Sequence, residues 1–272
     1  MNERTVRKRN IFNPFLRTYI LELRLRWKKI LLFSIVVIGF TFLISFSYPY
    51  HFDANTFLRD EIGYFKYLIV FISCFFFSDI VCSEFSSKTG YIMFPKINKY
   101  KLIIGKYNAN LSIIILLVII HYVTLIISVL IIYDTVIPEL FISLGFAVMY
   151  TITLSAIILL FSTIIPKVNI TTIIVIILFL IGFYIVEQVT TVINQEIEPI
   201  LSLNYIGNLI IYIIPGGFPL GTRWIWVYYA GETFPPVKHW LTPTIEMGIF
   251  IMSLYIALSF LFTFLALRRK EL

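Results

Sequence analysis

The chain has 272 residues, of which 59% are hydrophobic and 14% are charged, and its formal net charge is +7. Several uncharged runs are long enough to cross a hydrocarbon core of about 30 Å, which takes about 20 apolar helical residues. The sequence therefore predicts an all-α membrane protein. We expect no nucleic-acid partner, because the Lys and Arg residues cluster beside the apolar runs, as membrane topology requires.

Residues 1–29 form a basic segment with nine Lys or Arg residues, which we expect to stay on the cytoplasmic side. Asn13-Pro14 is typical of a helix start, where an N-cap precedes proline at the first helical position. The apolar and aromatic residues that follow recur at helical spacing: Phe15, Leu16, Tyr19, Ile20, Leu23 and Trp27. This pattern predicts an amphipathic helix in the membrane interface. The alternative is an ordinary charged flank of the first span.

Six apolar runs are long enough to be membrane spans. They cover residues 30–48, 64–82, 107–133, 140–165, 168–186 and 247–267. In this layout 18 of the 22 Lys and Arg residues lie on one side, in the N-terminal segment, the connection 83–106, the turn at Lys167 and the tail 268–272. Because cytoplasmic connections carry the excess of Lys and Arg, we predict that both termini are cytoplasmic.

The connection 187–246 is expected on the outer side. Its uncharged stretch 199–222 has an apolar centre, 205–214, that is too short for a span and is followed by a Pro-Gly-Gly turn. A seventh span would also place the Arg-rich tail outside, against the charge rule. We therefore expect a re-entrant or interfacial segment, with Trp and Tyr residues suited to the membrane interface.

The connection 83–106 carries five lysines against one carboxylate, Glu84. Gly90, Pro95 and Gly105 interrupt it, which predicts short helical pieces joined by turns. A short basic connection of this kind stays in the cytoplasm, where a soluble partner can bind it. The alternative is a solvated linker without a partner.

Six residues of this connection follow one another in a spaced pattern: Glu84, Thr89, Gly90, Pro95, Gly105 and Lys106. In their order and their place after the second span, they resemble the ABC-2 class of ABC transporter permeases. The chain departs from the family pattern in reading Thr-Gly instead of Gly-Thr. It also has Lys96-Ile97 after the proline, where a small polar residue and Arg are usual. The six-span layout agrees with the resemblance over the whole chain.

The resemblance implies an ABC-2 (type V exporter-like) transmembrane fold and a role as the membrane-spanning permease subunit of an exporter. It also implies a homo- or heterodimer in the lipid of a prokaryotic plasma membrane, with two copies of a separate ATPase that binds ATP and Mg. Closure of the ATPases would reach the spans through residues 83–106 and the N-terminal helix. Residues 187–246 would roof the transport path.

The sequence contains no convincing catalytic constellation. Its three His residues lie far apart, without metal-ligand spacing. Gly105-Lys106 does not complete a phosphate-binding loop, because Tyr100 stands where that motif requires glycine. We therefore expect no enzymatic activity and no cofactor or metal bound directly by this chain. The alternative function is a non-transporting membrane scaffold or sensor, whereas the missing cluster argues against an intramembrane enzyme.

Three carboxylates lie within or next to the predicted spans. A charge at the bilayer centre costs about 2.5–3.5 kcal/mol on insertion scales, so such acids are candidates for function. Asp79 lies in the second span near Glu84, and an interfacial ion pair with the basic connection is favoured over a functional intramembrane acid. Glu187 and Glu246 lie at the outer ends of the fifth and sixth spans. They are expected at the interface, with the lining of an outer vestibule as the alternative.

Overall fold

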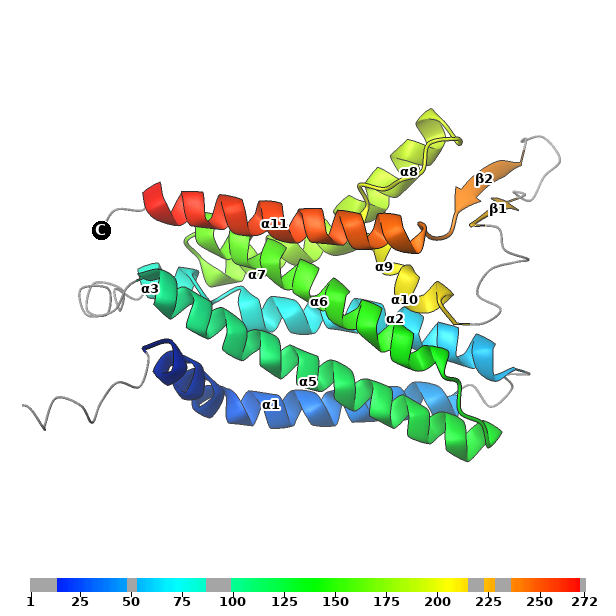
Figure 1. Ribbon diagram of the computed structural model, residues 1–272, viewed down its shortest axis with the longest axis horizontal. Helices are drawn as coiled ribbons and strands as arrows, with labels where there is room; N and C mark the ends of the chain where they lie inside the picture. Colours follow the sequence, from blue (N-terminus) through cyan, green and yellow to red (C-terminus); the bar gives the residue numbers. More distant parts are fainter. Residues whose placement is uncertain (1–13, 48–52, 87–98, 215–222, 228–235, 270–272) are drawn as a thin grey trace, which may run out of the picture.

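The computed structural model describes residues 14–47, 53–86, 99–214, 223–227 and 236–269. These residues are mostly helical and include six helices long and apolar enough to cross a membrane (Figure 1). The prediction of a helical membrane protein with six candidate spans is confirmed. α3 (Cys82–Ser86) marks one end of the bundle, and strands β1 (Trp224–Val227) and β2 (Val237–Trp240) mark the other. We call these the α3 end and the hairpin end.

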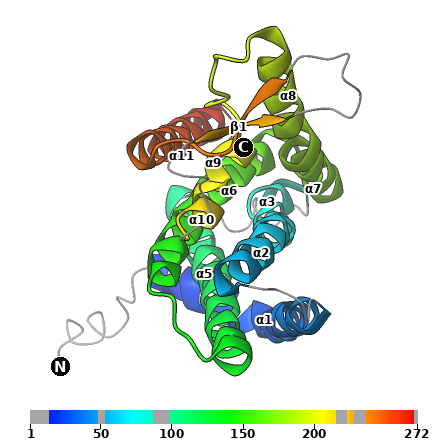
Figure 2. The same ribbon diagram turned by 90° about the vertical axis from the view of Figure 1, so that its right-hand side faces the viewer.

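α1 (Pro14–Ser47) joins the predicted interfacial helix and the first span in one helix. No proline or glycine lies between Phe15 and Ile38, so the local sequence does not end the helix at Ile30. Its first turns nevertheless run across the α3 end, at an angle to the rest of the helix (Figure 1 and Figure 2). The predicted interfacial helix and the predicted first span are therefore one continuous helix and not two separate segments.

α2 (Ala54–Phe77) begins ten residues before the expected span 64–82, so part of the expected polar connection belongs to this helix. Phe57, Leu58 and Ile62 are buried, which gives these first turns an apolar face against the core. Burial of that face outweighs the cost of the polar residues between them, since Asp60 is exposed and the buried Glu61 accepts a hydrogen bond from Ser45.

The predicted second span ends in a turn before α3, and a serine of α6 (Glu139–Ile164) holds this turn. Ser162 Oγ accepts a hydrogen bond from the backbone N–H of Val81 at 3.1 Å and donates to the carbonyl of Ser78 at 2.9 Å. Backbone groups left unpaired by the end of a helix need such partners when they are buried.

α5 (Lys99–Tyr133) begins eight residues before the expected span 107–133. Gly105 and Lys106, which were expected to close a loop, therefore lie within a helix. Neither the lysines nor a single glycine stopped the helix, since these residues cost little or moderate helical stability compared with proline. The expected connection 83–106 thus contains α3 and the first turns of α5.

The fifth span is longer than the predicted 168–186. It consists of α7 (Val168–Ile177), a single turn of π-helix, η1 (Leu178–Gly182), and α8 (Phe183–Ile193). Glu187 is therefore a helical residue and not the end of the span. The sixth span, α11 (Ile245–Arg269), packs along α6. Its bounds lie within two residues of the expected 247–267 at either end.

The connection between α8 and α11 contains two short helices, α9 (Leu203–Gly207) and α10 (Leu209–Tyr212), which lie beside α2 and α6 (Figure 1). Leu203, Ile206 and Ile210 are buried there. The described part of residues 199–222 therefore inserts as short buried helices and contains no helix long enough to cross a membrane.

β1 and β2 form an antiparallel hairpin that the sequence analysis did not predict, with Trp224 opposite Trp240. The Trp240 indole N–H donates to the carbonyl of Gln195 at 3.0 Å, and Arg223 Nη1 pairs with Glu198 Oε1 at 2.8 Å. These contacts attach the hairpin to the residues that follow α8. They place the predicted interfacial Trp residues together at the hairpin end.

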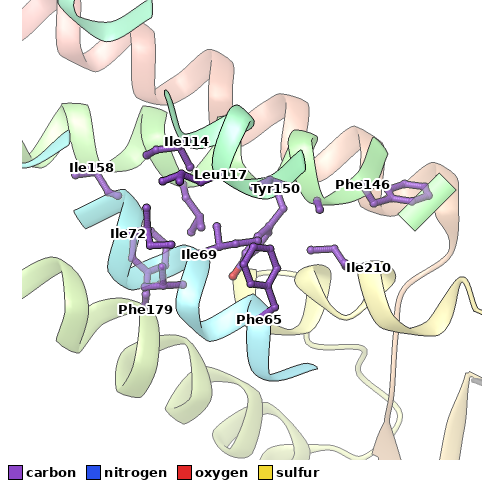
Figure 3. Packing of buried hydrophobic residues seen from close by; sticks show 14 of the residues in the cluster. Phe65, Ile69, Ile72, Ile114, Leu117, Phe146, Tyr150, Ile158, Phe179 and Ile210 are labelled. Atoms are coloured by element: carbon purple, nitrogen blue, oxygen red, sulfur yellow. The ribbon is translucent and has the colours of Figure 1, made fainter. Parts of the chain in front are cut away.

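The hydrophobic core is centred on α2, which is the most buried of the six candidate spans. Phe65, Ile69 and Ile72 of α2 meet residues from four other elements (Figure 3). These partners come from α5, α6, η1 and α10: Ile114, Leu117, Tyr150, Ile158, Phe179 and Ile210. α1, α7 to α8, and α11 are the least buried spans, so their apolar faces are available to lipid or to another subunit.

Candidate functional site at the α3 end

Four segments from distant parts of the sequence gather at the α3 end. They are the first turns of α1, α3, the start of α5 and the end of α11 (Figure 1). Residues 87–98, which connect α3 to α5, lie outside the described residues, and so do Thr89, Gly90 and Pro95. The structure therefore brings together the predicted interfacial helix and three predicted site residues, Glu84, Gly105 and Lys106.

Glu84 is 7% exposed and forms an ion pair with Lys106, through Oε1 and Nζ. The pair joins α3 to α5, and Gly105 beside it is buried. Glu84, which was predicted to contact a partner, is thus paired with Lys106 of the same chain. A pair shielded in this way is expensive to disrupt, because removing one partner leaves the other charge without compensation.

Asp79 forms an ion pair, but its partner comes from α1 and not from the basic connection. Arg26 Nη2 donates to the two carboxylate oxygens of Asp79 at 2.8 Å and 3.0 Å. Arg26 Nε also donates to Glu22 Oε1 at 2.6 Å, and Arg26 is 7% exposed. Sequence reasoning missed Glu22 and Arg26, although their spacing of four residues places them on one face of a helix.

The predicted interfacial stripe on α1 is partly exposed. Leu16 and Ile20 are each 38% exposed and Trp27 is 56% exposed, whereas Leu23 packs against the core. The Tyr19 hydroxyl donates to Ser112 Oγ on α5 at 3.1 Å. The side chain of Phe15 lies outside the described set. One side of these turns therefore contacts the bundle and the other presents apolar side chains, as an interfacial helix requires.

Glu187 lies in a buried polar network near the hairpin end. It is 5% exposed, and its Oε2 accepts a hydrogen bond from Asn204 Nδ2 at 2.9 Å. Asn204 Oδ1 and Asn208 Oδ1 in turn accept hydrogen bonds from Lys66 Nζ at 2.9 Å and 2.7 Å. Sequence reasoning assigned no role to Lys66, which is 3% exposed. Asn204 thus bridges a buried cation and a buried anion, whereas Asn208 links Lys66 to the carbonyl of Leu241.

This network borders a cavity of about 410 Å³ between α2 and α10. Arg59, Asp60, Lys66 and Tyr212 are among its lining residues. Glu246 does not belong to the lining and is exposed in the first turn of α11. Charged side chains of both signs therefore line the cavity, and all of them belong to α2.

The Glu198 carboxylate organises the start of the hairpin. Its Oε1 accepts hydrogen bonds from the Tyr205 hydroxyl and from Arg223 Nη1, each at 2.8 Å. Burial, and then the hydrogen bond to Glu198, raise the pKa of Tyr205 above its usual value. Tyr205 therefore acts as a neutral donor that ties α9 to the strands.

The described residues contain no group of three or more His, Cys, Asp or Glu residues that could hold a metal ion. His121 lies buried in α5 and His239 lies in β2, far apart along the sequence, and His51 is outside the described residues.

Comparison with models of known protein families finds no match, and comparison with curated proteins finds none that is significantly similar. The fold itself defines the class, a multi-pass helical membrane protein with six candidate spans. Its candidate functional site is the set of paired charges and helix ends at the α3 end.

Proposed function

We propose that the chain is the membrane-spanning permease subunit of an ABC-2-type exporter. In this proposal it works as a homo- or heterodimer with two copies of a separate ATPase, which binds ATP and Mg. One observation carries the proposal: the segments that the resemblance assigns to ATPase contact lie at the same end of the bundle. These are the first turns of α1 and the two ends of the connection 87–98, at α3 and α5.

The ion pairs at this end support such a role. Glu84 and Lys106 join α3 to α5, whereas Arg26 and Asp79 join α1 to the turn after α2. A displacement of α3 would therefore be passed to α5 and α2, and from α2 to α1. Energetic coupling between distant sites uses such chains of packed and paired side chains together with rigid helices.

The proposal places the α3 end in the cytoplasm, as the distribution of Lys and Arg requires. The long helices then pass force along the bundle towards the hairpin end. α9, α10 and the hairpin would cover the outer end of the path. The large exposed faces of α1, α7 to α8 and α11 leave room for the second permease subunit.

Affinity purification from native membranes tests the proposal. The tagged chain, extracted in mild detergent with a non-hydrolysable ATP analogue, should retain an ABC ATPase in comparable molar amount. After exchange into ATP and Mg, the purified complex should hydrolyse ATP. Recovery of the intact chain without any ABC ATPase would contradict the proposed function.

A further inference from the structure

Two titratable side chains are completely buried between α1, α2 and α5, and hydroxyl groups of α1 hold both of them. Ser45 Oγ donates to Glu61 Oε1 at 2.8 Å, and Thr41 Oγ1 lies 2.8 Å from His121 Nδ1. Glu61 and His121 each have 0% exposure. Because Thr41 and Ser45 are four residues apart, α1 holds the two groups on consecutive helical turns.

The hydrogen bond from Thr41 to Val37 favours one tautomer of His121. Thr41 Oγ1 donates its own hydrogen to the carbonyl of Val37 at 2.9 Å, so it can only accept from the imidazole. Neutral His121 therefore has its hydrogen on Nδ1 and a bare lone pair on Nε2. The ring stacks on Phe65 with centroids 3.4 Å apart, which holds it in this orientation.

Each group also has one buried atom without a partner among the described residues, namely Glu61 Oε2 and His121 Nε2. An unpaired buried polar atom is rare in proteins and costs the desolvation of that atom. The two atoms are chemically complementary, because a protonated Oε2 is a donor and Nε2 is an acceptor. Ser128 has a buried, unpartnered hydroxyl two turns beyond His121 on the same face of α5.

No cation among the described residues neutralises Glu61. Residues 30–47 of α1 and 107–133 of α5 contain no Lys, Arg, Asp or Glu, so His121 is the one titratable group besides tyrosines on these facing segments. The two nearest cations of α2 bond elsewhere, Lys66 to Asn204 and Asn208, and Arg59 to Asn55 and Thr56. The other charged side chains near the hairpin end, among the described residues around α2, are all carboxylates. They are Asp53, Asp60, Asp134, Glu139 and Glu187.

An ionised carboxylate in this position would lack both water and a counter-charge, which is strongly unfavourable. Glu61 therefore holds a proton when the three helices are packed as observed. It lies seven residues from the start of α2, about 10 Å along the helix, so the shorter way to water leads to the hairpin end.

We propose that Glu61 and His121 form a proton-binding pair inside the membrane-spanning bundle. In the observed packing the proton resides on Glu61 Oε2. Oε2 and Nε2 are not hydrogen-bonded to each other in this packing, so transfer requires a side-chain movement that brings them within hydrogen-bond distance. The transfer then breaks the O–H bond, forms an N–H bond at His121 Nε2, and leaves a carboxylate and an imidazolium that stabilise each other. Release to water of the Nδ1 proton of this imidazolium leaves the carboxylate and a neutral His121 that has its hydrogen on Nε2. To keep the contact between α1 and α5, the Thr41 hydroxyl must then turn its hydrogen from the Val37 carbonyl to the bare Nδ1.

Infrared spectroscopy of the purified chain in phosphatidylcholine vesicles tests this pair without any ATPase or substrate. At mildly acidic pH the wild type should show a carboxylic-acid C=O band that shifts in D₂O and is absent from Glu61→Gln. Raising the pH should replace the band reversibly by carboxylate bands. Ser45→Ala should move the band, because Oε1 loses its hydrogen bond, and this variant keeps the assignment testable if Glu61→Gln misfolds.

His121→Phe preserves a ring against Phe65 and removes both nitrogens. Glu61 should then keep its proton to higher pH than in the wild type, because its carboxylate has lost the imidazole donor. Glu246→Gln, at an exposed site, should leave the band unchanged. Three results would overturn the proposal: a carboxylate at Glu61 at every pH, a carboxylic acid that no pH deprotonates, or the same titration in His121→Phe as in the wild type.

Discussion

Glu84 contacts Lys106 within the same chain, yet the resemblance to ABC-2 permeases assigns its carboxylate to an ATPase partner. Both side chains are mostly buried, with exposures of 9% for Glu84 and 17% for Lys106. The intramolecular role and the proposed partner role can be separated by experiment. An ion pair tolerates exchange of its two charges, whereas a partner that recognises a carboxylate at one position does not.

Reversal of this ion pair is the first prediction. Glu84→Lys alone and Lys106→Glu alone should each lower the free energy of unfolding of the purified chain by about 2–5 kcal/mol, because each leaves two like charges together. The double exchange should restore most of that stability, as a double-mutant cycle would show. Under the proposed function, the restored chain should still fail to support transport at the normal rate. Normal transport by the double variant would show that Glu84 acts only within its own chain.

Arg26 carries the second prediction, because one guanidinium serves two carboxylates. Arg26→Gln should cost about 3–5 kcal/mol, since it leaves Glu22 and Asp79 facing each other without a cation. Asp79→Asn should cost only about 1 kcal/mol, because Arg26 keeps Glu22 and the amide oxygen still accepts a hydrogen bond. Lys28→Gln, at an exposed position, is the control and should change stability by less than about 0.5 kcal/mol. Thermal unfolding in detergent ranks the three variants by their loss of stability. Equal losses for Arg26→Gln and Asp79→Asn would contradict this prediction.

At the scale of elements, the sequence predicted which segments become spans and missed where several of them begin. Apolar runs determine the spans, since about 20 such residues match the bilayer. α2 and α5 begin well before their apolar runs, because polar residues and a single glycine, Gly63 or Gly105, do not stop a helix that contains no proline. The π-helical turn η1 carries no local sequence signal that we recognise. The hairpin was missed because its two strands have only four residues each.

The close packing of α9 against α6 and α2 gives the third prediction. A Cβ atom on Gly207 would lie 2.9 Å from Tyr150 Cε2 and 3.2 Å from Lys66 Cδ. Gly207→Ala should therefore destabilise the protein by about 1–3 kcal/mol, because the buried ring has little room to move. Gly145→Ala in α6 has no atom within 4 Å of the new Cβ and should gain up to about 1 kcal/mol of helical stability. Thermal unfolding measures the stability of both variants. Equal stabilities for Gly207→Ala and Gly145→Ala would contradict the close packing of α9.

At the scale of the whole molecule, the polar networks join residues that are far apart in the sequence, which is why sequence patterns did not reveal them. Arg26 and Asp79 are 53 residues apart, and Lys66 and Asn204 are 138 apart. A single sequence shows that Asp79 needs a partner, but several nearby basic residues would serve equally well. The location of the candidate coupling segments was easier to predict, because topology alone brings alternate connections to the same side.

The orientation of the bundle is the fourth prediction. Lys101, exposed near the start of α5, should lie on the cytoplasmic side, and Glu196, with 73% side-chain exposure, should lie outside. Cysteines at these two positions should react with a membrane-impermeant maleimide from opposite faces of oriented membrane vesicles. The native Cys74 and Cys82 are buried and supply a low background. Labelling of both positions from the same face would contradict the six-span topology.

Site-specific photocrosslinking tests the central claim most directly, because it asks which end of the molecule meets an ATPase. A photoreactive amino acid would replace Lys88, in the connection between α3 and α5, and in a matched control would replace Glu196 near the hairpin end. Irradiation of native membranes should link the Lys88 variant to an ABC ATPase identified by mass spectrometry, and should leave the Glu196 variant without that product. An ABC ATPase linked from Glu196 and not from Lys88, or from neither position in a correctly inserted chain, would contradict the proposed function.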